Sequence, residues 1–366
     1  MRDDVIAAPG ERLEMPRASE RPPSEAYDVA LLDLDGVVYL GGAAVAGAPE
    51  ALAEARRRGM RLAFVTNNAS RSPSAIVAEL TSLGVPASPA EVVTSAQAAA
   101  HLIADRVPVG SPVLVVGGIG LRLALRERGL RPVSTAAERP AAVVQGYGPG
   151  IDYALLTEAT LAVRAGAWYV ASNADATLPT ARGLQPGNGS LVQVIVNATG
   201  TRPVVAGKPE PPLHAETVAR TGAKRPLVVG DRLDTDIEGA VRVGADSMLV
   251  LTGVTGPADA VLAPPGQRPT YVAADLTGLL DPHPPVTAAG DEFRCGGWTA
   301  RRRTVQESPD GRAGGDGRAG AVRVEITGGG APIDGLRALC AAAWSAGAAV
   351  AADSVASAVG GLRFPG

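Results

Sequence analysis

The sequence of 366 residues predicts an α/β protein built on a parallel β-sheet. Short apolar runs alternate with helix-like segments, which is the pattern of a parallel sheet covered by helices. Polar residues able to carry chemistry follow several of these runs directly. In a parallel sheet such positions meet at one edge, where ligands bind. Apolar residues make up 46% of the chain, which is enough for a large core.

Composition excludes several classes of protein. The formal net charge of −3 gives no reason to expect nucleic acid or an anionic membrane as a partner. No segment is long and apolar enough to span a bilayer. The two cysteines, Cys295 and Cys340, have no metal-binding or disulfide spacing. Residues 1–25 are charged and rich in proline, so we expect a disordered tail, no signal peptide and a cytoplasmic protein.

The first expected strand, 29–32, carries the most informative motif. Asp33 and Asp35 follow it and are two residues apart, so on an extended chain they point to the same side. Two carboxylates held this close favour a cation between them, most simply a divalent metal. Gly36 then allows a sharp turn. Alone the motif is weak, because ordinary turns and calcium loops also contain it.

A helix over 49–58 and a strand over 61–65 follow, with Thr66, Asn67 and Asn68 at the end of that strand. A further helix over 73–83 begins after Ser72, a favourable N-cap. These elements form the first part of the core, 26–105. A second α/β alternation over 106–189 predicts an inserted domain. Its glycines at 117, 118 and 120 resemble a dinucleotide-binding loop, but Leu123 occupies the position of the third glycine, so a plain turn is favoured.

The second part of the core, 190–281, supplies the remaining candidates. A strand over 202–206 leads to Lys208, and a strand over 226–229 leads to Asp231 and Asp236. Residues 282–320 are rich in proline and glycine and predict a linker, with a short hairpin near Trp298. Residues 321–366 predict a small α+β unit. It carries no catalytic pattern, so packing or dimerisation is favoured over an independent binding or acyl-transfer module.

The four strand ends together indicate phosphate chemistry. Several carboxylates without a nearby set of histidines or cysteines suit Mg²⁺, which prefers oxygen ligands. One lysine, one hydroxyl and two amides suit the oxygens of a phosphoryl group. Each residue alone is most simply a turn or surface residue, and only the combined pattern favours a site.

The order of these motifs resembles the haloacid dehalogenase-like (HAD) superfamily. The segments LLDLDGVVY, FVTNNASRS, AGKPEP and VVGDRLDTDIEGA are similar to subgroup IIA, which contains 4-nitrophenylphosphatases, phosphoglycolate phosphatases and glycerol-3-phosphate phosphatases. The resemblance covers residues 27–253. It implies a Rossmann-like core with a C2-type cap inserted at 106–189 and the α+β extension at the C-terminus. It also implies homodimers that form through the cap.

The resemblance assigns a role to each candidate. Asp33 is the expected nucleophile, which forms an aspartyl-phosphate, and Asp35 the expected acid and base. Thr66, Asn67, Asn68 and Lys208 are expected to bind the phosphoryl group. The expected Mg²⁺ ligands are Asp33, the backbone carbonyl of Asp35, and Asp231. Asp236 is expected to support the metal's waters, or alternatively to pair locally.

The resemblance also narrows the substrate to a small phosphorylated metabolite. Relatives that act on pyridoxal phosphate have histidine where Leu178 stands, so Leu178 is the expected specificity residue. Glycerol 3-phosphate is the first expectation and 2-phosphoglycolate the second. A phosphate-binding regulator or phosphotransferase remains as an alternative of another class. For Leu178 itself, a plain position in the cap core also remains open.

Overall fold

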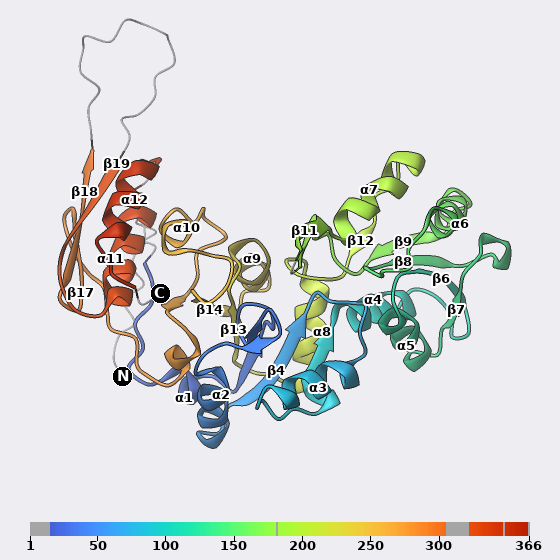
Figure 1. The fold of residues 1–366 in the computed structure, drawn as a ribbon, viewed down its shortest axis with the longest axis horizontal. Helices are drawn as coiled ribbons and strands as arrows, with labels where there is room; N and C mark the ends of the chain where they lie inside the picture. Colours follow the sequence, from blue (N-terminus) through green and yellow to red (C-terminus); the bar gives the residue numbers. More distant parts are fainter. Residues whose placement is uncertain (1–14, 181, 305–321, 347, 365–366) are drawn as a thin grey trace, which may run out of the picture.

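The computed structural model describes residues 15–180, 182–304, 322–346 and 348–364. Figure 1 shows three regions in a row: a central core, a cap formed by the green segments, and a C-terminal unit in orange and red. The expected α/β core is confirmed. No helix in the described part of the chain is long and apolar enough to cross a membrane.

The core is a parallel sheet of six strands. Their spatial order is β15 (Tyr271–Ala273), β14 (Asp246–Val250), β13 (Pro226–Gly230), β1 (Val29–Leu32), β4 (Arg61–Thr66) and β5 (Val92–Thr94). β1 is therefore central and pairs with β4 and β13. All four residues of β1 are buried, as expected for a strand covered on both faces.

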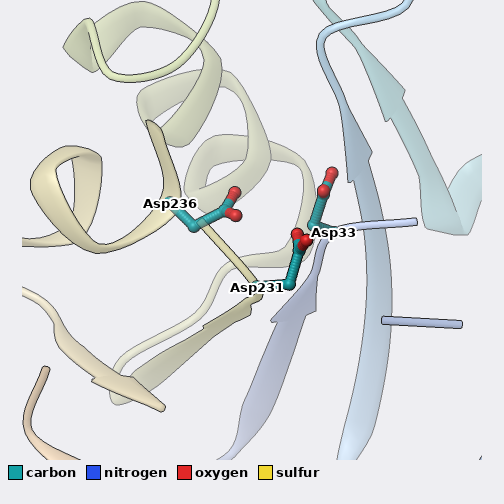
Figure 2. A group of neighbouring side chains, drawn as sticks. All are labelled: Asp33, Asp231 and Asp236. Carbon is teal, nitrogen blue, oxygen red and sulfur yellow. The ribbon is translucent and has the colours of Figure 1, made fainter. Parts of the chain in front are cut away.

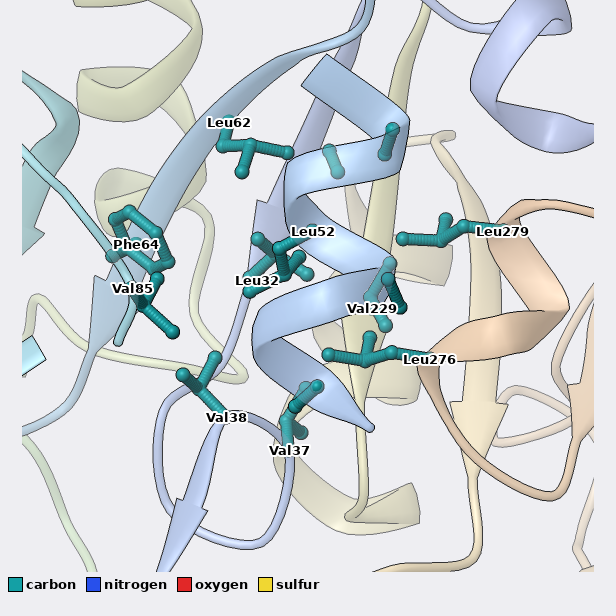
Figure 3. Close-up of a cluster of buried hydrophobic side chains, with 14 of the residues drawn as sticks. Leu32, Val37, Val38, Leu52, Leu62, Phe64, Val85, Val229, Leu276 and Leu279 are labelled. Carbon is teal, nitrogen blue, oxygen red and sulfur yellow. The ribbon is translucent and has the colours of Figure 1, made fainter. Parts of the chain in front are cut away.

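Alternate residues of β1 enter two different hydrophobic clusters. Ala30 and Leu32 face the cluster covered by α2 (Ala48–Arg57) and α3 (Pro73–Ser82). Figure 3 shows Leu52 of α2 over Leu32. Val29 and Leu31 face a second cluster on the opposite side of the sheet. On the core side this cluster is covered by three helices, α4 (Ser95–Ala104), α8 (Pro211–Thr221) and α9 (Glu238–Arg242).

Smaller elements complete the core. α1 (Pro23–Ala26) precedes β1, the hairpin of β2 (Tyr39–Leu40) and β3 (Ala43–Ala44) follows it, and α10 (Pro257–Val261) lies between β14 and β15. The prediction of a disordered tail over 1–25 is wrong for residues 15–25. There Arg17 pairs with Asp246 at 2.6 Å, and Met15 packs against the hydrophobic cluster of the C-terminal unit. Residues 1–14 lie outside the described residues.

The cap contains a second parallel sheet. Its spatial order is β12 (Val204–Val205), β9 (Trp168–Ala171), β8 (Ala142–Gln145), β6 (Pro112–Val116) and β7 (Arg131–Val133). Its helices are α5 (Ile119–Glu127), α6 (Tyr153–Arg164) and α7 (Asn188–Thr199), with a hairpin of β10 (Thr177–Thr180) and β11 (Gly183–Pro186). The predicted cap boundary at 189 is too early, because β12 pairs with β9 in the cap sheet.

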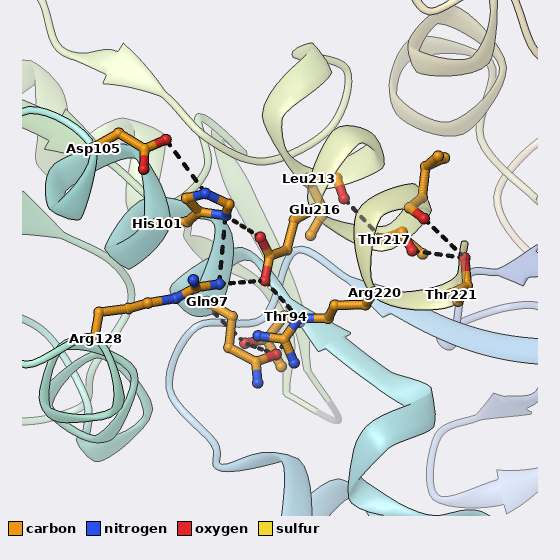
Figure 4. Close-up of polar contacts among 11 residues, drawn as sticks. Thr94, Gln97, His101, Asp105, Arg128, Leu213, Glu216, Thr217, Arg220 and Thr221 are labelled. Atoms are coloured by element: carbon orange, nitrogen blue, oxygen red, sulfur yellow. Dashed lines mark hydrogen bonds and ion pairs between the residues drawn. The ribbon is translucent and has the colours of Figure 1, made fainter. Parts of the chain in front are cut away.

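Cap and core are joined through α4. Its alanine-rich face belongs to one hydrophobic cluster that contains core residues such as Val65 and cap residues such as Val115. A polar cluster lies beside it (Figure 4). The buried carboxylate of Glu216 on α8 contacts His101 of α4 and pairs at 2.8 Å with Arg128, which follows α5. The cap is therefore fixed to the core on this side by both apolar and ionic contacts.

The C-terminal unit is larger than predicted. An antiparallel sheet is formed by β16 (Thr287–Ala289), β17 (Glu292–Cys295), β18 (Trp298–Thr304) and β19 (Val322–Gly328), with α11 (Pro332–Trp344) and α12 (Ala352–Gly360). The predicted linker over 282–320 is wrong for residues 287–304, which form three of these strands, but the hairpin expected near Trp298 is present as β17 and β18. Residues 305–321 lie outside the described residues. The inner face of the sheet packs on α11, which also contacts α10 and β15 of the core.

Candidate active site

The register of the core sheet brings the predicted residues to one edge. Leu32 at the end of β1 pairs with Phe64 of β4 and with Val229 of β13. Asp33 and Asp231, which follow β1 and β13, and Thr66, the last residue of β4, therefore lie at the same edge. Lys208 joins them from the segment between β12 and α8. A cavity of about 600 Å³ opens there, between this edge and the cap.

Lys208 is the positive centre of the site. Its ammonium is buried and lies 2.6 Å from Asp33 Oδ1 and 2.7 Å from Asp236 Oδ1. It also donates to the carbonyl of Val65 at 3.3 Å. Burial alone would lower the pKa of Lys208, but the charges of Asp236 and Asp33 outweigh it and raise this pKa above its ordinary value. The lysine therefore stays charged throughout the physiological range.

Three carboxylates lie close together in the site, those of Asp33, Asp231 and Asp236 (Figure 2). One oxygen from each of Asp33, Asp231 and Asp236 lies within 4.8 Å of the other two. Asp236 is already engaged, since it pairs with Lys208 and accepts from the Arg232 backbone N–H at 3.1 Å. Asp231 Oδ2 accepts from the Val254 N–H at 2.6 Å, whereas the buried Oδ1 has no hydrogen-bond partner among the described residues. Such an unsatisfied buried oxygen, next to a second carboxylate, fits a hard divalent cation.

The acids repel one another in this arrangement. Burial raises the pKa of Asp33 to about 6; Asp236 adds to the shift and Lys208 opposes it. Burial likewise raises the pKa of Asp231 to about 7, with further contributions from the charges of Asp33 and Asp236. One lysine therefore does not neutralise the group. A bound cation would favour the ionised form of Asp33 and Asp231.

Glycines make room for the Asp231 carboxylate. Gly36 has a φ of +78°, and a Cβ there would lie 2.4 Å from Asp231 Oδ2. A Cβ on Gly253 would lie 2.0 Å from the same atom. The Gly36 predicted from the turn is therefore required twice, by its backbone conformation and by the close approach of Asp231.

The other predicted residues differ in what their side chains contact. Asp35 is exposed to the cavity, and its surroundings raise its pKa to about 6, chiefly through partial desolvation and then through the charge of Asp33. Thr66 Oγ1 accepts from the Asn68 N–H at 3.0 Å and donates to no acceptor among the described residues, so its hydroxyl can donate to a ligand. Asn68 Oδ1 accepts from the Ser70 N–H at 2.9 Å, which leaves its amide N–H groups to the cavity.

Asn67 is used differently from the phosphate contact that was expected. Its side chain bonds the backbone of Lys208 on both sides, accepting from the N–H at 2.8 Å and donating to the carbonyl at 3.1 Å. The remaining amide proton points to Asp175 of the cap, 3.3–3.4 Å away. The structure thus places Asn67 as a contact between the core, Lys208 and the cap.

The cap contributes the expected Leu178 and two polar residues to which the sequence analysis gave no role. Leu178 lines the cavity and is half-buried, as its expected specificity role requires. Asp175 and Asn173 also line it, from the loop that follows β9. Their signal was present in the sequence, because polar residues directly after a parallel strand lie at the ligand-binding edge.

Comparisons with known proteins agree with this site. A family model described as haloacid dehalogenase-like hydrolase matches residues 30–131, and a second model of HAD-hydrolase-like proteins matches residues 205–279. D-glycerol 3-phosphate phosphatase of Mycobacterium tuberculosis is 51% identical over 256 residues, which are 70% of this chain and 72% of that protein. The chain therefore belongs to the haloacid dehalogenase-like hydrolases.

Solved structures narrow the group. A glycerol phosphate phosphatase from M. tuberculosis in complex with magnesium is 39% identical with a TM-score of 0.77, over 94% of this chain and 99% of that one. A 4-nitrophenylphosphatase from Thermotoga maritima is 30% identical with a TM-score of 0.66, over 70% of this chain and 97% of that one. Within the family the chain is a member of subgroup IIA and a phosphoric monoester hydrolase, which confirms the predicted phosphatase class.

Proposed function

We propose that the chain is a Mg²⁺-dependent phosphatase that releases phosphate from glycerol 3-phosphate through an aspartyl-phosphate on Asp33. The observation that carries the proposal is the environment of Asp33. Lys208 lies 2.6 Å from Asp33 Oδ1, and an oxygen of Asp231, whose Oδ1 has no hydrogen-bond partner among the described residues, lies within 4.8 Å of an Asp33 oxygen. Asp33 and Asp231, with the Asp35 carbonyl, would hold the ion. Bound Mg²⁺ would supply charge that lets an anionic nucleophile approach an anionic phosphate.

The side chains of this site can carry out both halves of the reaction. Asp33 forms a bond to phosphorus while the bond from phosphorus to the leaving oxygen breaks, and Asp35 gives that oxygen its proton. In the second half Asp35 takes a proton from a water that attacks the aspartyl-phosphate and frees Asp33 and phosphate. The pKa of Asp35, raised to about 6, suits a group that must give and take a proton near neutral pH. Thr66, Asn68 and Lys208 hold the phosphoryl oxygens.

The charges around the cavity favour glycerol 3-phosphate over 2-phosphoglycolate. Each cation that lines it is already paired: Arg71 with Glu79, Arg232 with Asp234, and Lys208 with Asp33 and Asp236. The carboxylate of 2-phosphoglycolate would therefore find no unpaired cation among the described residues that line the cavity, and would face Asp175. The neutral hydroxyl groups of glycerol do not meet this penalty. The relative named D-glycerol 3-phosphate phosphatase supports the same choice.

A comparison of the two substrates tests this proposal. With Mg²⁺ present we expect kcat/KM for glycerol 3-phosphate to exceed that for 2-phosphoglycolate by at least ~10-fold, and both activities to disappear with a chelator. Asp33→Asn should lower kcat by at least ~10³-fold, because the amide is no nucleophile. A higher kcat/KM for 2-phosphoglycolate would contradict the substrate choice. Phosphate release by Asp33→Asn at the wild-type rate would contradict the mechanism.

The assembly and location belong to the same proposal. We infer a homodimer that forms through the cap, supported by exposed apolar side chains on α6 and α7, where Leu161 is 51% and Val194 45% accessible. Sedimentation analysis of the wild type against Leu161→Glu tests it, and a monomeric wild type would contradict it. A cytoplasmic location is supported by Cys295 and Cys340, which are both free thiols.

A further inference from the structure

Asn67 lies where the catalytic lysine and the cap meet. The chain returns from the cap to the core through β12, which ends at Val205, and Lys208 follows only three residues later. Any displacement of the cap therefore acts on the backbone that carries Lys208. Asn67 comes from the other side, directly after β4 of the core. Its side chain contacts both the Lys208 backbone and the cap.

Two hydrogen bonds hold the backbone of Lys208 against the side-chain amide of Asn67. One amide oxygen and one amide N–H bond the two peptide groups of Lys208, at 2.8 and 3.1 Å. Gly207 lies so close that a Cβ there would be 2.5 Å from Asn67 Oδ1. With the Lys208 backbone held in this way, its ammonium reaches both Asp33 and the Val65 carbonyl. Asn67 therefore fixes the position of the lysine charge relative to the nucleophile.

The cap meets Asn67 through a well-held loop. Asn173 donates to the Asn67 carbonyl at 2.7 Å, and the Asp175 carboxylate accepts from Asn67 Nδ2 at 3.3–3.4 Å. The first turn of α7 supports this loop, since Asn188 donates to the Asn173 carbonyl at 2.7 Å and the Gly189 N–H donates to the Asp175 carbonyl at 2.9 Å. Asp175 thus moves with the body of the cap.

The carboxylate of Asp175 depends on Asn67. Among the described residues it forms no ion pair, because the neighbouring Arg232 directs its guanidinium to Asp234 at 2.8 and 3.0 Å. The adjacent Asn68 shows what an ordinary turn asparagine does here: its oxygen bonds Ser70 in its own loop. Asn67 instead places its whole amide between Lys208 and the cap.

We propose that Asn67 is a positioning residue for Lys208, and that its hydrogen bond to Asp175 is the latch that couples the position of the cap to that lysine. When the cap is seated, Asp175 holds the Asn67 amide in the plane that grips Lys208. When the cap lifts, this restraint is lost and the lysine charge is less well aligned with Asp33. The proposal rests on the phosphatase activity and is independent of which phosphate monoester is the natural substrate.

Exchange of the two side chains provides the test. Asn67→Asp removes the donor to the Lys208 carbonyl and sets two carboxylates against each other. The double variant Asn67→Asp with Asp175→Asn restores one donor and one acceptor across the boundary, in the reverse direction. The matched control combines Asn67→Asp with Asp152→Asn, which removes a cap carboxylate at the N-cap of α6. Steady-state kcat and KM are measured with 4-nitrophenyl phosphate at saturating Mg²⁺, together with the melting temperature of each variant.

We expect Asn67→Asp to lower kcat by ~10²-fold and to raise KM, because misplacement of a catalytic charge by about 1 Å has effects of this size. The exchange should recover at least ~10-fold of the lost kcat/KM, and the Asp152 control none. Asp175→Ala keeps both hydrogen bonds between Asn67 and the Lys208 backbone but removes the restraint on the Asn67 amide, so it should lower kcat by ~10-fold, less than Asn67→Asp does. This variant decides the latch even if Asn67→Asp does not fold. A wild-type kcat for Asp175→Ala, equal activities of Asn67→Asp and the exchanged pair, or equal recovery by the Asp152 control would each overturn the proposal.

Discussion

At the scale of single residues, the site has an excess of negative charge that the protein alone does not balance. Asp33, Asp231 and Asp236 share one buried lysine, and the pKa values of Asp33 and Asp231 rise to about 6 and about 7. Buried acids with raised pKa values destabilise the fold as the pH rises, because the unfolded chain releases their protons more readily. A cation bound to these carboxylates offsets that cost.

This charge balance predicts a pH-dependent stabilisation by Mg²⁺. At pH 5 the two acids are largely protonated, so saturating Mg²⁺ should raise the melting temperature only slightly. At pH 8 both are ionised, and we expect a rise several degrees larger. Asp231→Asn should remove most of this rise at pH 8. Equal shifts at both pH values, or an undiminished shift in Asp231→Asn, would contradict the assignment of these residues to the metal.

The sequence predicted the site residues that lie at the ends of strands. Asp33, Thr66, Lys208 and Asp231 could be placed together because each follows a predicted strand and parallel strands end at one edge, although the strand before Lys208 joins the cap sheet in the structure. The actual contacts of Asn67 could not be foreseen, because they depend on where the cap returns to the core. The hydrogen bond between Asn67 and Asp175 could not be foreseen for the same reason: the distance between these two side chains depends on how the two domains are oriented.

At the scale of elements, the contact between α8 and α9 buries a histidine whose polar nitrogens lower the stability of the fold. His214 on α8 is 1% exposed, packs against Gly239 of α9, and has no hydrogen-bond partner for either ring nitrogen among the described residues. Burial lowers the pKa of this imidazole to about 3. The folded protein therefore keeps His214 neutral at pH values at which the unfolded chain binds a proton.

His214 makes the protein less stable in acid. The pKa of His214 in the folded protein lies below its value of about 6.5 in the unfolded chain. Above pH 6.5 the imidazole is neutral in both states and does not affect the free energy of unfolding. As the pH falls below 6.5 the unfolded chain binds a proton that the folded protein does not, so the free energy of unfolding decreases. At pH 5 the loss is about 2 kcal/mol. His214→Leu should remove this loss, so the melting temperature of the variant should exceed that of the wild type by more at pH 5 than at pH 7. Parallel pH profiles for the two proteins would show that His214 does not titrate on unfolding.

Element prediction failed where strands were short or half exposed. Strand β12 has only two residues, and nothing in such a length indicates which of two sheets it joins. Strand β18 begins with buried Trp298 and Ala300 on either side of Thr299 and continues with three arginines, which look like a solvated linker. The core strands were found more easily because both of their faces are buried, which gives continuous apolar runs.

At the scale of the whole molecule, the C-terminal unit is part of the core rather than an appendage. One hydrophobic cluster contains Val261 and Val272 of the core together with Leu336 and Leu339 of α11. The buried guanidinium of Arg337 donates to the Val272 carbonyl at 2.8 and 3.0 Å. The same cluster includes Ile237, next to Asp236, so the unit also supports the segment that carries the acidic site.

Removal of this unit should therefore unfold the protein or weaken it strongly. A chain that ends at residue 285 would expose several apolar side chains of the core, each contributing about 1.5–3 kcal/mol when buried. We expect aggregation or a melting temperature at least ~10 °C lower, with loss of phosphatase activity. A milder variant, Arg337→Met, should lower stability by about 2 kcal/mol without removing the unit. A truncated chain with wild-type melting and turnover would make the unit dispensable.

Helix α4 has a consequence for how the molecule comes apart. Its small alanine side chains are buried against residues of both the inserted region and the central sheet, so neither can lose its structure without exposing the surface of the other. The core and the cap are separate domains in the architecture, but because they share this buried surface we expect them to unfold together as one cooperative unit. The inserted domain is therefore not expected to fold on its own. To replace it with another domain, the apolar face of α4 would have to be redesigned as well.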